Sequence, residues 1–179
     1  NTEGFHHEIA EWLKANPDTK LAFQPGTFQI KLGTDKLKDI YELSELFFCN
    51  LEEAQRILNS KELDPSKLMD MLHELGPKIV VMTNGIKGAY AREENGDKWF
   101  MPVYPHEPVE RTGAGDAYAS TITSAFAMGK SLAEAMTWAP INAMSVTQQI
   151  GAQKGLISQE KIEEYLQNAP EDYKMQQLK

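Results

Sequence analysis

The chain has 179 residues, of which 41% are hydrophobic and 25% are charged, a composition typical of a globular protein with one real core. Acidic residues outnumber basic ones by 26 to 18, and the formal net charge of -8 argues against binding to nucleic acid or to an anionic membrane surface. Cys49 is the only cysteine, which excludes a disulfide framework and a metal site built from several thiolates, so we expect a reducing, cytoplasmic setting.

Three short apolar runs predict buried strands, at residues 20–23, 45–50 and 78–83. Apolar side chains at helical spacing precede and separate them, around residues 9–13, 37–43, 54–58 and 68–75. Short apolar strands separated by helices indicate parallel pairing, right-handed crossovers and helices that cover the sheet.

A hairpin through Asn95-Gly96 is expected to follow, with strands near residues 88–92 and 98–103. From Asp116 onward the pattern is helical, and it predicts helices at 117–128, 132 to about 150, and 159–167. The polar tail 169–179 is expected to fray. Because no break in composition interrupts the alternation, the sequence predicts a single domain over residues 1–179.

The segment 111–117 (Arg-Thr-Gly-Ala-Gly-Asp-Ala) carries the clearest chemical signal. Its small residues let the backbone approach a ligand, and the N–H groups at the start of the next helix form a positive pocket suited to phosphoryl oxygens. Asp116 falls in the first turn of that helix, where its carboxylate can accept a proton from an attacking hydroxyl. The alternative is an ordinary tight turn followed by a helix-capping aspartate.

Two further loops follow predicted parallel strands, at the sheet edge where such folds bind ligands. The loop 83–88 (Thr-Asn-Gly-Ile-Lys-Gly) can wrap the phosphates or ribose of a nucleotide, although hairpin junctions use the same residues for geometry alone. Asn50 and Glu53 fit a helix-capping pair, and they also suit Mg2+ held through water. The four histidines lack a second ligand at metal spacing, so the sequence predicts solvated or packing roles for them.

Together these three segments resemble the motifs of the ribokinase-like, or PfkB, family of carbohydrate and nucleoside kinases. Residues 112–116 match the family's C-terminal signature, residues 50–53 its Asn-x-x-Glu motif, and residues 83–88 its Thr-x-Gly-x-x-Gly loop. The similarity extends from about Lys20 to Gly151-Ala152. It implies a three-layer α/β/α fold with a mainly parallel central sheet, from which the family's N-terminal part and its lid are missing.

The resemblance also implies roles for individual residues. Asp116 would be the catalytic base, and Glu53 would help to hold Mg2+. The positions that it assigns to ATP are Asn50, Thr83, Gly85, Gly88, Gly113, Ala114, Gly115 and Asn142. The family's usual Asp-Thr pair is replaced by Glu110-Arg111, which puts a possible monovalent-cation site in doubt.

The sequence also departs from the family at its N-terminal side. The family's sugar-contacting aspartate, its Gly-Gly motif and the early strands of its sheet have no counterpart here, and the sequence does not begin with Met. We therefore expect the C-terminal, nucleotide-binding portion of a longer kinase. A sheet with one uncovered edge favours self-association, so a homo-oligomer is expected as well.

These observations predict an ATP-dependent phosphotransferase that moves the γ-phosphoryl group to a hydroxymethyl group of a sugar or nucleoside. The alternative is a catalytically inert nucleotide-binding or oligomerising module without an acceptor site. An assay for ADP release that depends on an added sugar would separate these two interpretations.

Overall fold

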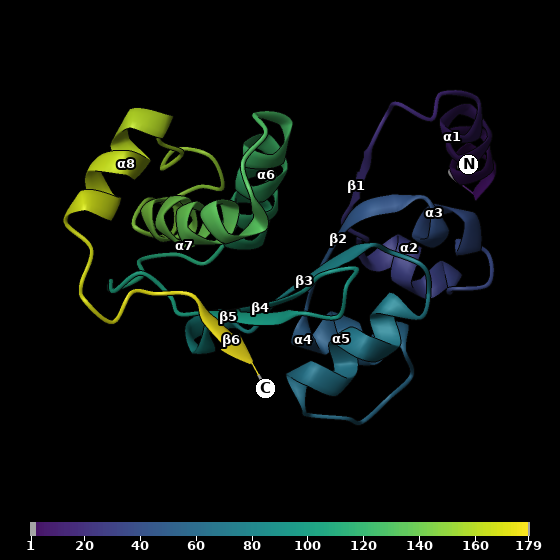
Figure 1. Cartoon of the computed structure of the whole chain (residues 1–179), viewed down its shortest axis with the longest axis horizontal. Coiled ribbons are helices and arrows are strands. Elements are labelled where there is room, and N and C mark those ends of the chain that lie inside the picture. The colour runs from purple at the N-terminus through teal and green to yellow at the C-terminus, as the bar shows by residue number, and fades with distance from the viewer. Residues whose placement is uncertain (1–2, 179) are drawn as a thin grey trace. The chain divides into compact units, whose positions relative to one another are not determined.

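The computed structural model describes residues 3–178 (Figure 1). Asn1, Thr2 and Lys179 lie outside the described residues. The start of the sequence without Met and the last residue of the predicted tail fall on these positions. The described chain divides into two compact units, residues 3–84 with 90–98, and residues 85–89 with 99–178. The single domain over residues 1–179 stays a prediction.

The strands form a mixed, mainly parallel sheet whose order follows the chain, β1-β2-β3-β4-β5-β6. Their bounds are Leu21–Phe23 (β1), Ser44–Asn50 (β2), Ile79–Thr83 (β3), Ala89–Arg92 (β4), Lys98–Met101 (β5) and Gln176–Leu178 (β6). β1 with β2 and β2 with β3 pair in parallel, as the sequence predicts. The turn at 93–97 joins β4 to β5, which confirms the hairpin because five residues are too few for a crossover.

Helices occupy most of the chain between and after the strands. Their bounds are Glu3–Ala15 (α1), Thr27–Leu32 (α2), Lys38–Glu42 (α3), Leu51–Ile57 (α4), Pro65–His73 (α5), Ala114–Ala127 (α6), Leu132–Thr147 (α7) and Gln159–Gln167 (α8), with a 3-10 turn at Gly85–Lys87 (η1). Within the described residues, no helix is both long and apolar enough to cross a membrane.

The first unit is built around β2 and β3, whose central residues are buried in unbroken runs. Such runs are typical of parallel strands covered on both faces. Next to them Phe23, Tyr41 and Phe47 form an aromatic cluster, with ring centroids 5.4–5.9 Å apart. This core fixes the register in which Asn50 at the end of β2 lies beside Thr83 at the end of β3.

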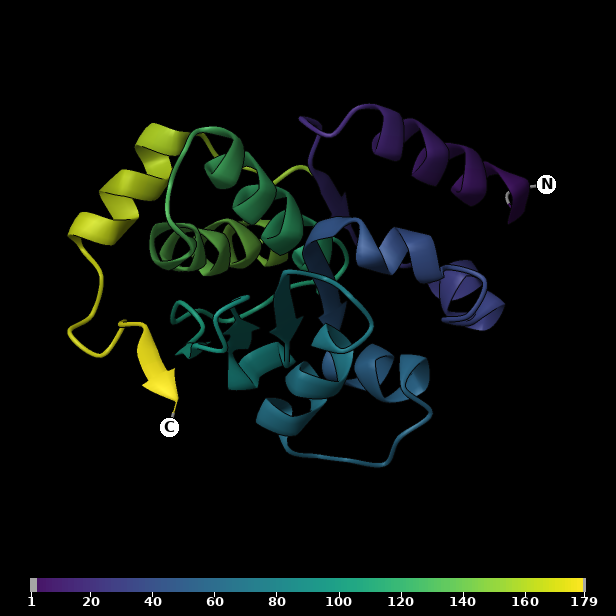
Figure 2. The same cartoon turned by 45° about the vertical axis from the view of Figure 1, so that its right-hand side comes forward.

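In the second unit, α6 packs against α7 (Figure 2). Small buried residues, among them Ala125, Ala135 and Ala139, line these helices and let their backbones come close together. α8 packs on α7 in turn and buries Ile162. This packing of α6 fixes the position of its N-terminus, which begins at Ala114, three residues before the predicted start.

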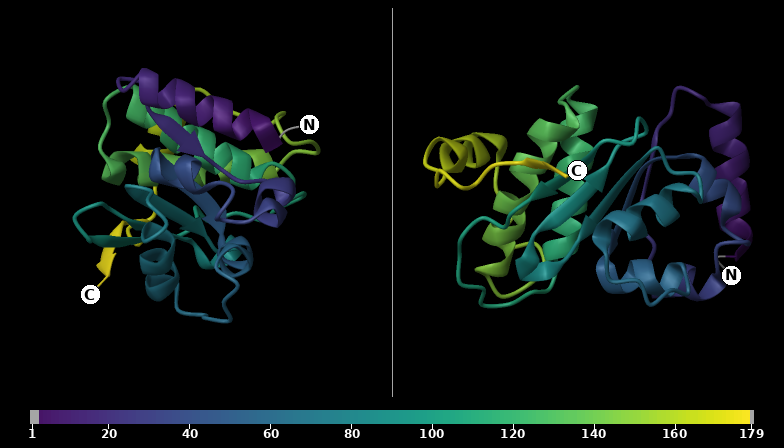
Figure 3. Two further views of the ribbon diagram at one scale, coloured as in Figure 1. Left: turned by 90° about the vertical axis from the view of Figure 1, so that its right-hand side faces the viewer. Right: turned by 60° about the horizontal axis from the view of Figure 1, so that its bottom comes forward.

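The chain after α8 does not fray over its described residues, so that prediction was wrong. Tyr173 is buried, its hydroxyl donates to the Thr137 carbonyl at 2.6 Å, and its ring lies edge-on to Tyr104 with centroids 5.0 Å apart. β6 then adds to the sheet next to β5 (Figure 3). One buried tyrosine therefore anchors this tail.

Candidate functional site

The start of α6 is shaped by the close approach of another segment. Gly113, at the N-cap position, has a φ of +86°, a conformation that side chains of L-residues rarely adopt. A Cβ atom at Gly113 would lie 2.5 Å from the carbonyl oxygen of Ala152. The sequence prediction of a small-residue turn here is correct, and the structure adds that Ala152 packs directly against it.

Asp116 is exposed and lies in the first turn of α6. Because Gly113 holds the N-cap position, Asp116 is not the N-cap residue. The first N–H groups of an α-helix have no partner within that helix, and the positive end of the helix dipole favours a negative charge beside them. The turn thus combines a positive helix end with an exposed carboxylate, which is the arrangement the sequence predicted for a phosphate site.

Glu110 joins the segment before α6 to the loop after α7. Its carboxylate accepts a hydrogen bond from the Gly151 N–H at 2.8 Å. Hydrogen bonds from this N–H and from the Thr112 side chain lower the pKa of Glu110. In the sequence, Glu110 was notable only for replacing the family's aspartate, and a monovalent cation near this position stays a prediction.

Asn142 lies buried in α7, and its side-chain amide is engaged within the unit. Its Nδ2 donates to the Thr121 hydroxyl at 2.8 Å, and its Oδ1 accepts from the Ile157 N–H at 3.2 Å. These two bonds tie α6, α7 and the chain before α8 together. The predicted position of Asn142 beside an adenine ring is not tested by this geometry.

At the end of β2, Asn50 and Glu53 form a complete capping box on α4. The Asn50 N–H donates to Glu53 Oε2 at 2.8 Å, and the Glu53 N–H donates to Asn50 Oδ1 at 2.9 Å. The capping interpretation of these residues is therefore confirmed, while the predicted role toward Mg2+ stays a prediction. The box presents one carboxylate and one amide at the carboxyl edge of the sheet, next to Thr83.

The loop after β3 carries the two remaining predicted glycines. Gly85 begins the 3-10 turn η1, and space is open where its Cβ would be. Gly88 has a φ of +96°, and a Cβ there would lie 2.5 Å from the Met101 carbonyl oxygen. The close approach of β5 is thus sufficient to require glycine at position 88, whatever the loop binds.

The predicted site residues divide between the two units. Asn50, Glu53 and Thr83 come together in the first unit, at the ends of neighbouring strands. The others lie in the second unit: Gly85, Gly88, Gly113, Ala114, Gly115, Asp116 and Asn142. Cys49, next to the first group, is fully packed, and burial raises the pKa of its thiol, so it does not act as a nucleophile at neutral pH.

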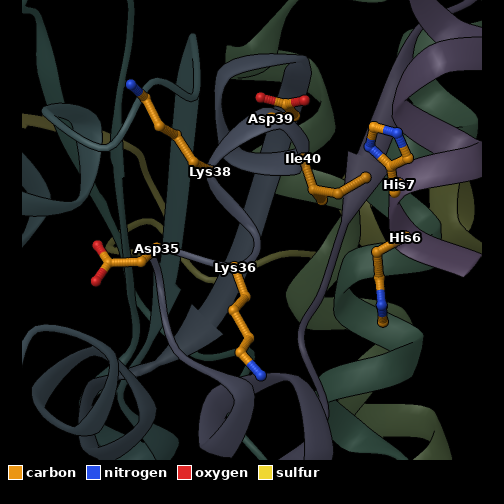
Figure 4. A pocket seen from close by; sticks show the side chains of 7 residues that line it. All are labelled: His6, His7, Asp35, Lys36, Lys38, Asp39 and Ile40. Atoms are coloured by element: carbon orange, nitrogen blue, oxygen red, sulfur yellow. The ribbon is translucent and has the colours of Figure 1, made fainter. Parts of the chain in front are cut away.

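A separate small pocket of about 150 Å3 lies in the first unit, and none of its residues belongs to the three motifs. It is lined by His6, His7, Asp35, Lys36, Lys38, Asp39 and Ile40 (Figure 4). Beside it, His7, Glu11 and Asp39 bring possible metal-ligand atoms within 4.8 Å of one another. The sequence analysis missed this cluster, although the four-residue spacing of His7 and Glu11 on one helix was a usable signal.

The cluster already has a cationic partner. The Lys14 ammonium lies 2.9 Å from Asp39 Oδ2 and 3.0 Å from Glu11 Oε1. Its hydrogen bond and charge lower the pKa of Asp39. A metal ion would have to displace this lysine from an exposed site, so Glu11 and Asp39 are accounted for as members of a surface ion-pair network.

Comparison with known proteins gives one family. The sequence profile of the pfkB family carbohydrate kinases matches residues 6–159. The chain is 32% identical to a cytidine kinase of Thermococcus kodakarensis over 101 residues, which cover 56% of this chain and 36% of that protein. This match is a sequence relationship and is independent of the fold comparison.

Solved structures give the same fold. A ribokinase of Arabidopsis thaliana complexed with ribose and ATP superposes with a TM-score of 0.78, at 20% identity, over 92% of this chain and 52% of that one. A candidate ribokinase II of E. coli in complex with ATP and Mg2+ superposes with a TM-score of 0.76, at 23% identity, over 89% of this chain and 52% of that one. The predicted ribokinase-like fold is confirmed, and the chain spans 36–52% of the length of these three proteins.

Proposed function

The chain belongs to the pfkB family of carbohydrate kinases, and we propose that it is the nucleotide-binding part of a kinase that uses ATP. The reaction would transfer the γ-phosphoryl group to a hydroxymethyl group of a sugar or nucleoside. The observation that carries this proposal is the start of α6, where Gly113 opens a helix with Asp116 exposed in its first turn. A positive helix end, a run of small residues and an exposed carboxylate lie together at this turn.

The start of α6 suits the phosphates of ATP. Residues 113–115 carry no side chain larger than a methyl group, so none of their own side chains would keep phosphoryl oxygens from the backbone of the first turn. The dipole of a 14-residue helix places partial positive charge at this end. As negative charge develops on the transferring group and on the leaving phosphate, these fixed donors stabilise it.

Asp116 would act as the general base. Its carboxylate accepts the proton of the acceptor hydroxyl while the hydroxyl oxygen forms a bond to the γ-phosphorus atom. The bond between that phosphorus and the bridging oxygen breaks, and ADP leaves. In the first unit, Asn50 and Glu53 offer oxygen ligands of the kind that Mg2+ prefers.

The names of the related proteins support the substrate class. The sequence relative is a cytidine kinase, and a protein with the same fold was solved with ribose and ATP. Both acceptors present a primary alcohol, and a hydroxyl group is the nucleophile that an aspartate base can activate. We therefore propose a sugar or nucleoside as the acceptor.

Substitution of Asp116 tests this function. Asp116→Asn preserves size and polarity but cannot take up the hydroxyl proton, so the turnover number should fall by about a hundred- to ten-thousand-fold. The apparent affinity for ATP should change little. The measurement is ADP release with ribose and with cytidine as acceptors. It compares a parent protein that shows turnover with its Asp116→Asn variant.

Two outcomes would contradict the proposal. Turnover of the Asp116→Asn variant within a few-fold of the parent would remove the aspartate from the mechanism. In the longer kinase of which this chain would be a part, ATP binding with no turnover of any sugar or nucleoside would favour the inert nucleotide-binding module instead.

A further inference from the structure

The turn that opens α6 is held by a second segment of the same unit, the loop 148–155 that follows α7. Three sets of contacts join the segment 109–113 to this loop and to Thr147, the last residue of α7. The N–H groups of Val109 and Glu110 both donate to the Thr147 carbonyl, at 2.8 and 3.0 Å. The Glu110 carboxylate accepts the Gly151 N–H, and Ala152 packs against Gly113.

The Glu110 contact differs in kind from the other two. It is made by a side chain, which reaches a residue 41 positions later in the sequence. The other contacts are backbone hydrogen bonds or a close approach to the backbone of Gly113. The Glu110 contact holds Gly151, the residue directly before Ala152, which packs against Gly113. A side chain can therefore set the position of a turn whose own residues are too small to fix it.

We propose that Glu110 is a positioning residue for the anion pocket: it holds the loop 148–155 against Gly113 and thereby fixes the first turn of α6. The proposal rests on the proposed function, since it is the phosphate site of ATP that this turn would form. Glu110 touches neither nucleotide nor acceptor in this role.

Electrostatics alone would predict the opposite effect of this residue. A carboxylate close to the start of α6 repels phosphate, so its removal should tighten anion binding if charge were its only contribution. The carboxylate is instead engaged by the Gly151 N–H and the Thr112 side chain, and these hydrogen bonds lower its pKa, so it is ionised at neutral pH as an ordinary glutamate is. A hydrogen bond to an ionised acceptor is stronger than one to a neutral acceptor, which suits a structural tie.

The test compares Glu110→Ala and Glu110→Gln with Glu107→Ala, which removes the same charge from an exposed position three residues earlier. Hydrogen–deuterium exchange is measured over residues 148–155 and 113–117, and affinity for the Mg2+ complex of a non-hydrolysable ATP analogue is measured by calorimetry. Glu110→Ala should accelerate exchange in both segments and weaken the analogue about tenfold. Glu110→Gln keeps a hydrogen-bond acceptor at the same distance from the backbone, so it should retain part of the exchange protection and part of the analogue affinity. Glu107→Ala should change neither the exchange rates nor the affinity.

Analogue binding by Glu110→Ala that equals or exceeds that of the parent would overturn the proposal, and so would unchanged exchange over 113–117. If the parent bound no nucleotide, the proposed function would fail, and exchange over 113–117 would still decide whether Glu110 positions that turn. Should Glu110→Ala not fold, Glu110→Asp takes its place, because it keeps the charge but shortens the side chain. It should likewise accelerate exchange in both segments and weaken analogue binding.

Discussion

At the scale of single residues, Gly113 meets two separate demands. Its backbone has a positive φ, and Ala152 leaves no room for a side chain. Gly129 provides a matched control, because it has a similar φ of +78° but open space where its Cβ would be. Comparing the two positions therefore separates the conformational cost from the steric one.

We expect Gly129→Ala to lower the free energy of unfolding by about 1–2 kcal/mol, the usual cost of the left-handed conformation for an L-residue. Gly113→Ala should lose about 1–3 kcal/mol more, because the new methyl group forces Ala152 away. Urea unfolding of both variants measures the difference. Equal losses would show that the loop 148–155 does not pack against Gly113.

The same residues show how far sequence reasoning reaches. The turn 112–116 and the base candidate Asp116 could be located because small residues followed by an acidic one form a contiguous pattern. The partners of Asn142 could not be predicted, since Thr121 and Ile157 lie 21 and 15 positions away and only the packing of α6 on α7 brings them together. For the same reason, nothing in the sequence linked Glu110 to Gly151.

At the scale of elements, the capping box on α4 offers a way to separate structure from metal binding. Glutamine serves as well as glutamate at the third position of a capping box, so Glu53→Gln should keep the Asn50 contacts and leave thermal stability nearly unchanged. It removes the negative charge, so the affinity for Mg2+ in the presence of an ATP analogue should fall several-fold. Calorimetric titration with Mg2+ measures this effect.

Asn50→Ala is the complementary variant. It removes the side-chain acceptor of the cap and should lower the free energy of unfolding by about 1 kcal/mol. If Glu53→Gln bound Mg2+ as tightly as the parent, the pair would be a cap and nothing more.

Most elements could be predicted from their apolar spacing, and two could not. α2 (Thr27–Leu32) follows Pro25-Gly26, a turn signal, and has no buried residue to give it a helical pattern. β6 lies in a polar tail whose order depends on Tyr173 reaching Thr137, a tertiary contact without a local sequence pattern. Short apolar strands such as β2 and β3 were predictable because burial on both faces requires every central residue to be apolar.

At the scale of the whole molecule, two features favour self-association. β1 stands at the end of the strand order, and the large side chains of Phe5 and Trp12 on α1 are 57% and 55% exposed. We expect light scattering to give a mass above the 20.1 kDa of one chain, with a second copy as the partner. Trp12→Lys should shift the mass toward one chain.

Leu63→Lys is the control for this effect, since Leu63 is 73% exposed in the loop between α4 and α5. It should leave the mass of the parent unchanged. A parent that scatters as a single chain up to millimolar concentration would contradict the expected homo-oligomer.

The central claim is that the start of α6 is the phosphate site of ATP, and a crystal structure with a non-hydrolysable ATP analogue and Mg2+ tests it most directly. The analogue's β- and γ-phosphates should lie against the backbone N–H groups of residues 113–116, with Asp116 facing the γ-phosphate. Gly115→Val, which fills the approach to that backbone, should abolish binding while the fold persists. Phosphates located elsewhere, for instance at Gly129-Lys130, or unchanged affinity of the Gly115→Val variant, would contradict the account.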